Sequence, residues 1–237
     1  MPTNSGWLPS TSVNAGFALY RTLYVRFAWL LDFMLRFFAH PLPEIRGPPD
    51  SEGVIFSLNV GRGIPKRACD QSFVTRLGVL GDAQAQPYIR PWGGHGGEKK
   101  AVMLWSLDVI QKIASEGHPH CKPGRCGEQV TVSGVNWALA KTGAHIQLGD
   151  HVLLEVTYMK GPCSQQEPNF TEGVGDGIHR ISADRYPDDS RVHTRVLRGG
   201  YVAAGDRVRV WRSPRATSGV VVRCSSDPGN FISKEYD

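Results

Sequence analysis

The sequence predicts a mainly β protein, a β-barrel with a few peripheral helices and an N-terminal amphipathic helix. Three observations support this prediction. The 237 residues include 27 glycines and 16 prolines, which favours many turns over a helical bundle. Residues 152–158 carry apolar side chains at every second position, the period of a half-buried strand. A Gly-Asp turn followed by an alternating strand occurs twice, at Gly149 and at Gly205.

Composition divides the chain into three parts. Residues 1–50 hold a polar tail, an amphipathic helix at 17–38 and a proline-rich linker. Residues 51–212 form the barrel domain, and residues 213–237 form a weakly patterned tail. On the helix, a broad face of Phe and Leu lies opposite an arc of charged residues, with no acidic residue before Asp32. This pattern is typical of a helix on a membrane surface, and it equally fits a mitochondrial targeting segment or a helix packed on the domain.

Within the domain, each element has a local signal. Residues 54–60 read as a strand, and Ser106 is a suitable N-cap for a helix that ends at Gly117. The strand after Gly149 should carry Val156 and Tyr158 on the same face, because side chains alternate along a strand. We expect the strands after the two Gly-Asp turns to be neighbours in one barrel.

Charge and cysteine content limit the classes of function. The formal net charge of +5 favours an anionic partner, but the positive residues are spread along the chain, so we expect no nucleic-acid binding. Five cysteines at irregular spacing suggest no disulfide framework, which favours a reducing, intracellular compartment. We therefore expect a cytoplasmic or mitochondrial protein, membrane-associated if residues 17–38 bind a membrane surface.

Cys163 is the first candidate for chemistry. It follows Lys160, Gly161 and Pro162 at the end of an alternating strand, so its thiol is attached to a rigid scaffold without being inside it. A nucleophilic or metal-binding cysteine needs such partial exposure and a positive neighbour. The alternative is a small buried apolar residue.

Two glycine-rich segments add candidates. Arg62, Lys66 and Arg67 stand beside glycines just after a strand, where backbone N–H groups and cations can hold an anion. The alternative there is a glycine turn with solvated charges. His95 is followed by Gly96 and Gly97, so a flat ligand can approach its ring closely.

These segments occur in a characteristic order. The chain reads Gly-Val-Leu-Gly-Asp-Ala-Gln-Ala at 78–85, His-Gly-Gly at 95–97, Ala-Val-Met-Leu at 101–104, Gly-Arg-Cys-Gly-Glu-Gln-Val-Thr-Val-Ser-Gly at 124–134, Gly-Asp at 149–150 and Pro-Cys at 162–163. Over residues 54–206 this order resembles the MOSC domain family, which is related to the C-terminal domain of molybdenum cofactor sulfurases. The nearest resemblance is to its stand-alone bacterial branch, which reduces N-hydroxylated bases.

The resemblance implies a MOSC-type β-barrel that binds a molybdenum-pterin cofactor (molybdopterin), with Cys163 as the protein ligand to molybdenum. It implies a pterin-phosphate site at Arg62, Lys66 and Arg67, and a cofactor-side role for the His95 loop, with His95 a candidate proton donor.

It also makes Asp82 and Glu128 candidates to accept hydrogen bonds from the pterin ring, although either could instead cap a turn. The substrate would be a small N-hydroxylated molecule. Electrons would come from an external donor protein, because the sequence shows no flavin, haem or iron–sulfur motif.

An alternative function is a sulfur or cofactor carrier with a persulfide on Cys163, and another is a binding module that has lost its metal. The chain departs from the family at three places, of which the loop at 86–94 and residues 164–167 flank the expected pocket and bear on substrate identity. Gln129 replaces the usual Asn, the loop at 86–94 is longer, and Ser-Gln-Gln-Glu at 164–167 replaces aromatic and basic residues.

Overall fold

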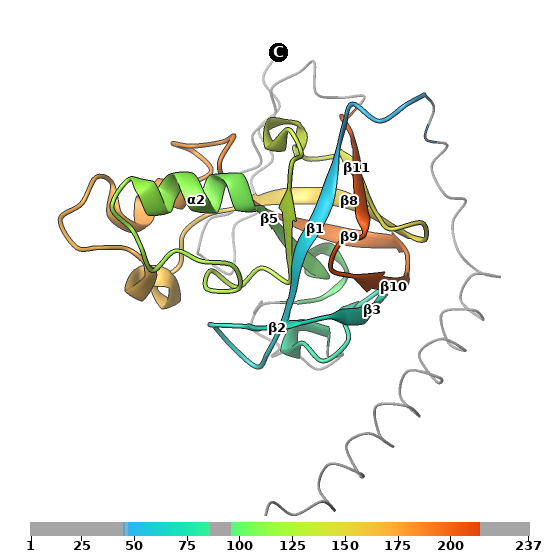
Figure 1. Cartoon of the computed structure of the whole chain (residues 1–237), viewed down its shortest axis with the longest axis horizontal. Helices are drawn as coiled ribbons and strands as arrows, with labels where there is room; N and C mark the ends of the chain where they lie inside the picture. Colours follow the sequence, from blue (N-terminus) through green and yellow to red (C-terminus); the bar gives the residue numbers. More distant parts are fainter. Residues whose placement is uncertain (1–44, 46, 86–95, 214–237) are drawn as a thin grey trace, which may run out of the picture. The chain divides into compact units, whose positions relative to one another are not determined.

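The computed structural model describes residues 45, 47–85 and 96–213, and the predicted helix at 17–38 lies outside this range. Residue contacts divide the chain into units at 1–41 and 42–237, and all described residues belong to the second. Seven strands close a barrel, in the order β11-β7-β8-β9-β5-β6-β1, with β1 pairing back to β11 (Figure 1). The predicted mainly β barrel is confirmed. The barrel strands are β1 (Ser51–Val60), β5 (Val102–Ser106), β6 (Val130–Ser133), β7 (His145–Leu148), β8 (Val152–Lys160), β9 (Arg191–Arg198) and β11 (Arg207–Trp211).

Smaller elements surround the barrel. The strand β2 (Arg67–Cys69) pairs with β1, and a separate sheet has the order β10-β3-β4. Its strands are β3 (Gln71–Thr75), β4 (Gly78–Val79) and β10 (Gly200–Ala203). The helical segments are α2 (Leu107–Ser115) and the short 3₁₀ helices η1 (Ala83–Ala85), η2 (Glu98–Lys100), η3 (Trp137–Leu139), η4 (Ser164–Asn169) and η5 (Gly177–Ile181).

The barrel contains one parallel pair among the strands that the structure describes, β5 with β6. Parallel neighbours need a crossover, and α2 provides it. The helix begins where predicted, because the Ser106 hydroxyl accepts a hydrogen bond from the Asp108 N–H at 3.2 Å. Gly117 follows its end with φ of 107°, a conformation that favours glycine.

Apolar side chains from all barrel strands fill the interior. Leu58, Leu104, Ile146, Leu154 and Val208 are each fully buried. Burying one such side chain contributes roughly 1.5–3 kcal/mol. The alternation seen in the sequence therefore does place one face of each strand in the core.

The two Gly-Asp turns belong to the same barrel, but the prediction that their strands are neighbours is wrong. The strands that follow them are β8 and β11, and β7 lies between the two. The turn at Gly149 instead contacts β11 directly, since its N–H donates to the Arg207 carbonyl at 2.8 Å. The two Gly-Asp turns correctly indicate two strands of the same sheet. Which strands are neighbours depends on contacts between residues distant in sequence, which the turns do not indicate.

A β-bulge near the end of β8 overturns a second prediction. The pairing with β9 shifts between Val156 and Tyr158, so that Val156 lies opposite Thr194 while Tyr158 lies opposite His193. The extra residue turns Tyr158 to the outer face of the barrel, where its ring packs on His193 at 4.8 Å. Met159 then packs against the core instead.

The segment between β8 and β9 includes η4 and η5 and lies on the same side of the barrel as α2 (Figure 1). This segment carries Cys163, just beyond the strand that the bulge redirects. Among the residues that the structure describes, no helix is long and apolar enough to cross a membrane.

Candidate functional site

Cys163 lies at a fixed point just after β8, as the sequence predicts. It precedes η4 and is partly exposed. Its N–H donates to Gln166 Oε1 at 3.2 Å, and its carbonyl accepts from the Gln166 N–H at 2.9 Å. The backbone N–H and the backbone carbonyl of Cys163 are therefore both hydrogen-bonded to Gln166. The thiol lies just beyond the end of β8 and is partly exposed.

The side chain of Arg191, a fully buried cation, donates hydrogen bonds to the loop that carries Cys163. Arg191, the first residue of β9, donates from Nη1 to the Cys126 carbonyl at 2.6 Å and from Nη2 to the Gly161 carbonyl at 2.8 Å. The same Nη2 donates to Gln166 Oε1 at 3.0 Å. One guanidinium thus joins segments that carry two different cysteines.

Burial lowers the pKa of Arg191, and electrostatic interactions with Cys126, Glu128, Cys163 and Cys121, in that order, oppose this effect. The guanidinium also lies over the Trp105 ring at 5.9 Å. The guanidinium thus places a fixed positive charge within electrostatic range of Cys163. Arg191 carries no motif in the sequence, and its only local signal is a charged residue at the start of a buried strand.

The two thiols at Cys121 and Cys126 have a different character. Both are fully buried, and the Cys126 pKa is raised well above its ordinary value by a hydrogen bond with Cys121 and by burial. A buried thiol with a raised pKa is a poor nucleophile and a poor ligand. Among the described cysteines, only Cys163 and Cys69 are partly exposed.

The structure brings Lys66 and Asp82 together in a buried ion pair at 2.5 Å. Asp82 also accepts from the Gly61 N–H, the Gln84 N–H and Gln129 Nε2, each at 3.0 Å. Both carboxylate oxygens are therefore occupied by protein groups, as in a residue that organises turns. The other two predicted cations of this segment, Arg62 and Arg67, are exposed.

Gln129, which departs from the family pattern, uses its longer side chain to bridge two elements. Its Oε1 accepts from the Met103 N–H at 2.8 Å, while its Nε2 reaches Asp82 and Gln84. The amide thus connects β5 to the turn that holds Asp82.

Glu128 is fully buried at the other side of the same segment. Its Oε1 accepts from the Gly124 N–H at 2.5 Å and from the Thr131 hydroxyl at 3.3 Å. Its Oε2 has no hydrogen-bond partner within the described part of the chain. Burial raises the pKa of this carboxyl group. Because Lys66 N–H donates to the Gly124 carbonyl at 2.8 Å, Glu128 and the glycine-rich segment meet at Gly124.

Of the predicted His-Gly-Gly loop, His95 lies outside the described residues. Gly96 and Gly97 have φ of 107° and 86°, conformations that favour glycine. The loop is anchored on β8, since the Thr157 hydroxyl donates to the Lys99 carbonyl at 2.6 Å. Lys100 lies 5.8 Å from the centre of the Tyr158 ring. The loop at 96–100 therefore contacts the bulged end of β8, the strand that leads to Cys163.

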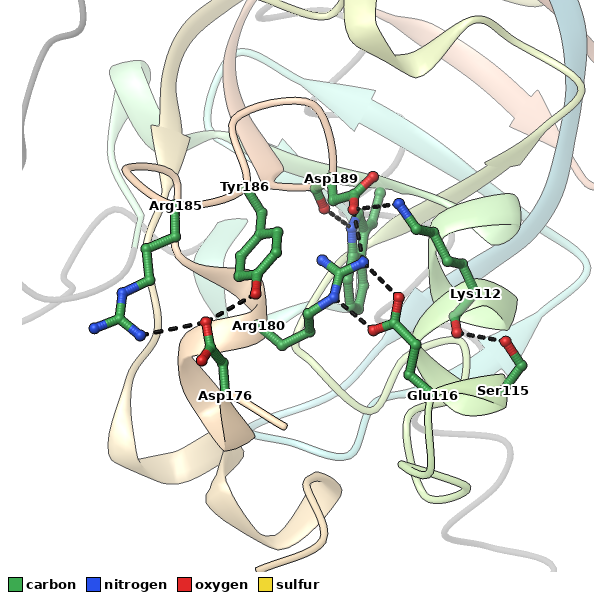
Figure 2. Close-up of polar contacts among 9 residues, drawn as sticks. Lys112, Ser115, Glu116, Asp176, Arg180, Arg185, Tyr186 and Asp189 are labelled. Carbon is green, nitrogen blue, oxygen red and sulfur yellow. Dashed lines mark hydrogen bonds and ion pairs between the residues drawn. The ribbon is translucent and has the colours of Figure 1, made fainter. Parts of the chain in front are cut away.

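A cavity of about 330 Å³ lies at α2 and η5, and none of its lining residues belongs to the Cys163 network. Figure 2 shows that its charged groups are already paired. Arg180 donates to both Glu116 oxygens, at 2.5 and 2.9 Å, and to Asp189 at 2.7 Å, while Tyr186 donates to Asp176 at 2.8 Å. These contacts join η5 to the end of α2, so we assign this cluster a role in stability.

The groups around Cys163 can support two kinds of chemistry. A partly exposed thiol near a buried cation can act as a nucleophile or as a ligand for a soft metal. Within the described residues, no cluster of three or more His, Cys, Asp or Glu side chains could hold a metal ion.

Comparison with known proteins agrees with this fold. A family model described as the MOSC domain matches residues 93–209. A reductase from Gibberella moniliformis is 26% identical over 145 residues, which is 60% of this chain and 24% of that protein. The chain thus spans about a quarter of the length of this curated relative.

Among solved structures, the YuaD protein from Bacillus subtilis superimposes with a TM-score of 0.54 at 18% identity, covering 67% of this chain and 95% of YuaD. This likeness shows the fold. The family match covers the strands β8 and β9 and the loop between them, which carries Cys163. Residues 93–209 of this chain thus carry a MOSC domain.

Proposed function

We propose that this protein is a MOSC oxidoreductase that binds a molybdenum-pterin cofactor through Cys163 and reduces small N-hydroxylated substrates. The observation that carries the proposal is the partly exposed Cys163 thiol, held beside the buried Arg191 cation in a MOSC domain. The name of the curated relative, a reductase, supports the reaction class. MOSC domains are associated with molybdenum cofactor binding in general.

The donor groups fit a cofactor of this kind. A metal delivered by an organic cofactor needs only one ligand from the chain, and a thiolate suits a soft metal centre. Arg191 Nε and Glu128 Oε2 are buried polar atoms without a hydrogen-bond partner among the described residues, as is common where a site is completed by another group. The exposed Arg62 and Arg67 are available for a phosphate, whereas Lys66 and Asp82 bond to each other.

Each part of the proposed reaction has a separate source. The cofactor would supply two-electron redox chemistry, and the protein would supply the thiolate, an anion site and a proton donor, for which His95 is the candidate. Electrons would come from an external donor protein. A small substrate would reach the site beside the partly exposed Cys163.

The test compares two cysteines of similar exposure. Cys163→Ser replaces a soft ligand with a hydroxyl at nearly equal volume, so folding should barely change. Cys69→Ser makes the same replacement at the other partly exposed thiol. In protein from a host that makes the cofactor, reduction of an amidoxime with an artificial electron donor should fall by more than about 100-fold in Cys163→Ser only.

Elemental analysis of the same preparations gives the independent measurement. We expect about one molybdenum per chain in the wild type and in Cys69→Ser. Near wild-type reduction by Cys163→Ser would contradict the ligand assignment. Absence of molybdenum together with sulfane sulfur on Cys163 would instead support the carrier function.

A further inference from the structure

We propose that Gln166 and Arg191 are positioning residues that hold the Cys163 thiol at the functional site. The proposal rests on the function above only for its activity measurement. The hydrogen-exchange measurement that tests positioning is made on cofactor-free protein, so the positioning role and the proposed function can fail separately.

Gln166 is the residue that fixes the Cys163 peptide. It is 4% exposed, and its side chain accepts from the Cys163 N–H while its own N–H donates to the Cys163 carbonyl. Its Nε2 donates to the Cys126 carbonyl at 3.1 Å. The side-chain amide therefore uses both its acceptor and its donor to connect Cys163 to the segment that carries Cys126.

Arg191 fixes Gln166 in turn. Its two terminal nitrogens reach the Cys126 carbonyl, the Gly161 carbonyl and Gln166 Oε1. The guanidinium reaches these acceptors from two separate nitrogens held in one plane, whereas the three N–H donors of a lysine share a single nitrogen. Arg191 thus holds the loop both before and after Cys163.

The loop has little else to hold it. Within the described part of the chain, the hydrogen bonds of residues 161–163 are made with Gln166 and Arg191. A Cβ added at Gly161 would meet no atom within 4 Å, so the backbone is not packed there. Pro162 has no N–H to donate. The place of the thiol therefore depends on these two side chains.

Hydrogen exchange of the Cys163 amide tests the proposal directly. Gln166→Leu removes the acceptor of that N–H, and Gln165→Leu makes the same change at the exposed neighbouring position. In cofactor-free protein, amide exchange in residues 161–166 should increase about 10-fold or more in Gln166→Leu. It should stay at the wild-type rate in Gln165→Leu.

A conservative variant separates positioning from general packing. Gln166→Glu keeps an oxygen that can accept from both Cys163 N–H and Arg191, but it loses the donor to the Cys126 carbonyl. It should restore most of the protection that Gln166→Leu removes. Arg191→Lys keeps the buried charge but loses the two-nitrogen donor geometry of the guanidinium, so it should increase amide exchange in residues 161–166. Arg195→Lys, at an exposed position on the same strand, should not.

In the cofactor-loaded protein, a misplaced thiol should lower kcat by about 10- to 100-fold in Gln166→Leu while KM stays within about twofold. If the wild type reduces no substrate, the proposed function fails, and the exchange comparison still decides the positioning role. Equal exchange in Gln166→Leu and Gln165→Leu would overturn the inference. So would an increase spread over the whole barrel, because that would show a loss of general stability.

Discussion

Glu128 shows how burial sets the behaviour of a single residue. The carboxyl group is fully buried, and burial raises its pKa above the ordinary value of 4.5, against the opposing effects of the Gly124 N–H and Arg191. The unfolded chain releases this proton near the ordinary value, while the folded protein retains it to higher pH. Between the two pKa values the folded state binds more protons, so stability falls as pH rises above about 4.5.

We predict that Glu128→Gln flattens this dependence, because an amide does not ionise. From pH 5 to pH 8, the free energy of unfolding of the wild type should fall more steeply than that of the variant. Urea denaturation at each pH measures the difference. Glu172→Gln, at an exposed position, should keep the wild-type slope. Identical slopes for wild type and Glu128→Gln would contradict the raised pKa.

Cys163 is the residue on which the proposed function depends, and its neighbours explain how this thiol differs from the other described thiols. The Cys121 and Cys126 thiols lie in the interior, whereas Cys163 lies at the edge of the barrel with its peptide bonded to Gln166. Cys163 is distinguished by its partial exposure and by the nearby Arg191. Both features are set by the residues packed around the cysteine.

At the scale of elements, Arg180 joins the short helix η5 to the C-terminal end of α2 (Figure 2). Burial acts to lower the Arg180 pKa, but hydrogen bonds with Glu116 and Asp189 outweigh it and the pKa is raised. The Arg180 side chain is 6% exposed and that of Glu116 36% exposed, so solvent weakens part of the attraction. Arg180 is nevertheless shared by two acidic groups, of which Asp189 also pairs with Lys112 at 2.9 Å.

We predict that Arg180→Met lowers the free energy of unfolding by about 2 kcal/mol, because it leaves Glu116 and Asp189 without their shared partner. Arg185→Met is the matched control. Arg185 is exposed and pairs with Asp176 at 3.3 Å, so its loss should change stability by less than about 0.5 kcal/mol. Urea denaturation compares the two, and equal effects would show that the Arg180 contacts add no stability.

At the scale of the whole molecule, the barrel is closed by strands from its two ends in sequence. β1 pairs with β11 in antiparallel register, with Ser51 opposite Val210 and Val54 opposite Arg207. The ring is therefore complete within residues 51–211. Its closure removes the exposed edges that β1 and β11 would otherwise present.

We predict that deletion of residues 1–45 leaves the barrel folded and its cofactor content unchanged, because the seven strands of the closed ring all lie within residues 51–211. The Phe and Leu face at 17–38 predicts that the full chain sediments with lipid vesicles and the truncated chain does not. Vesicle cosedimentation and thermal unfolding measure the two effects. A truncated protein that misfolds would show that the segment belongs to the fold.

Patterns within a few neighbouring residues were enough to predict much of this protein. The helix that begins after Ser106 and ends before Gly117 was predicted correctly, because its capping groups are adjacent in sequence. The strand that precedes Cys163 was also predicted, and with it the position of the thiol at a strand end. The same kind of pattern, taken in order along the chain, indicated the MOSC family and the barrel.

Only the tertiary structure decided what surrounds that thiol. The bulge after Val156 turns Tyr158 outward, and alternation cannot predict it because one extra residue exchanges the two faces of a strand. Lys66 and Asp82, whose role in binding the cofactor stays a prediction, form an ion pair with each other across 16 residues. Arg191 reaches Gln166 across 25 residues and Cys126 across 65. A sequence pattern records the period of an element, but such distant contacts depend on how the elements pair.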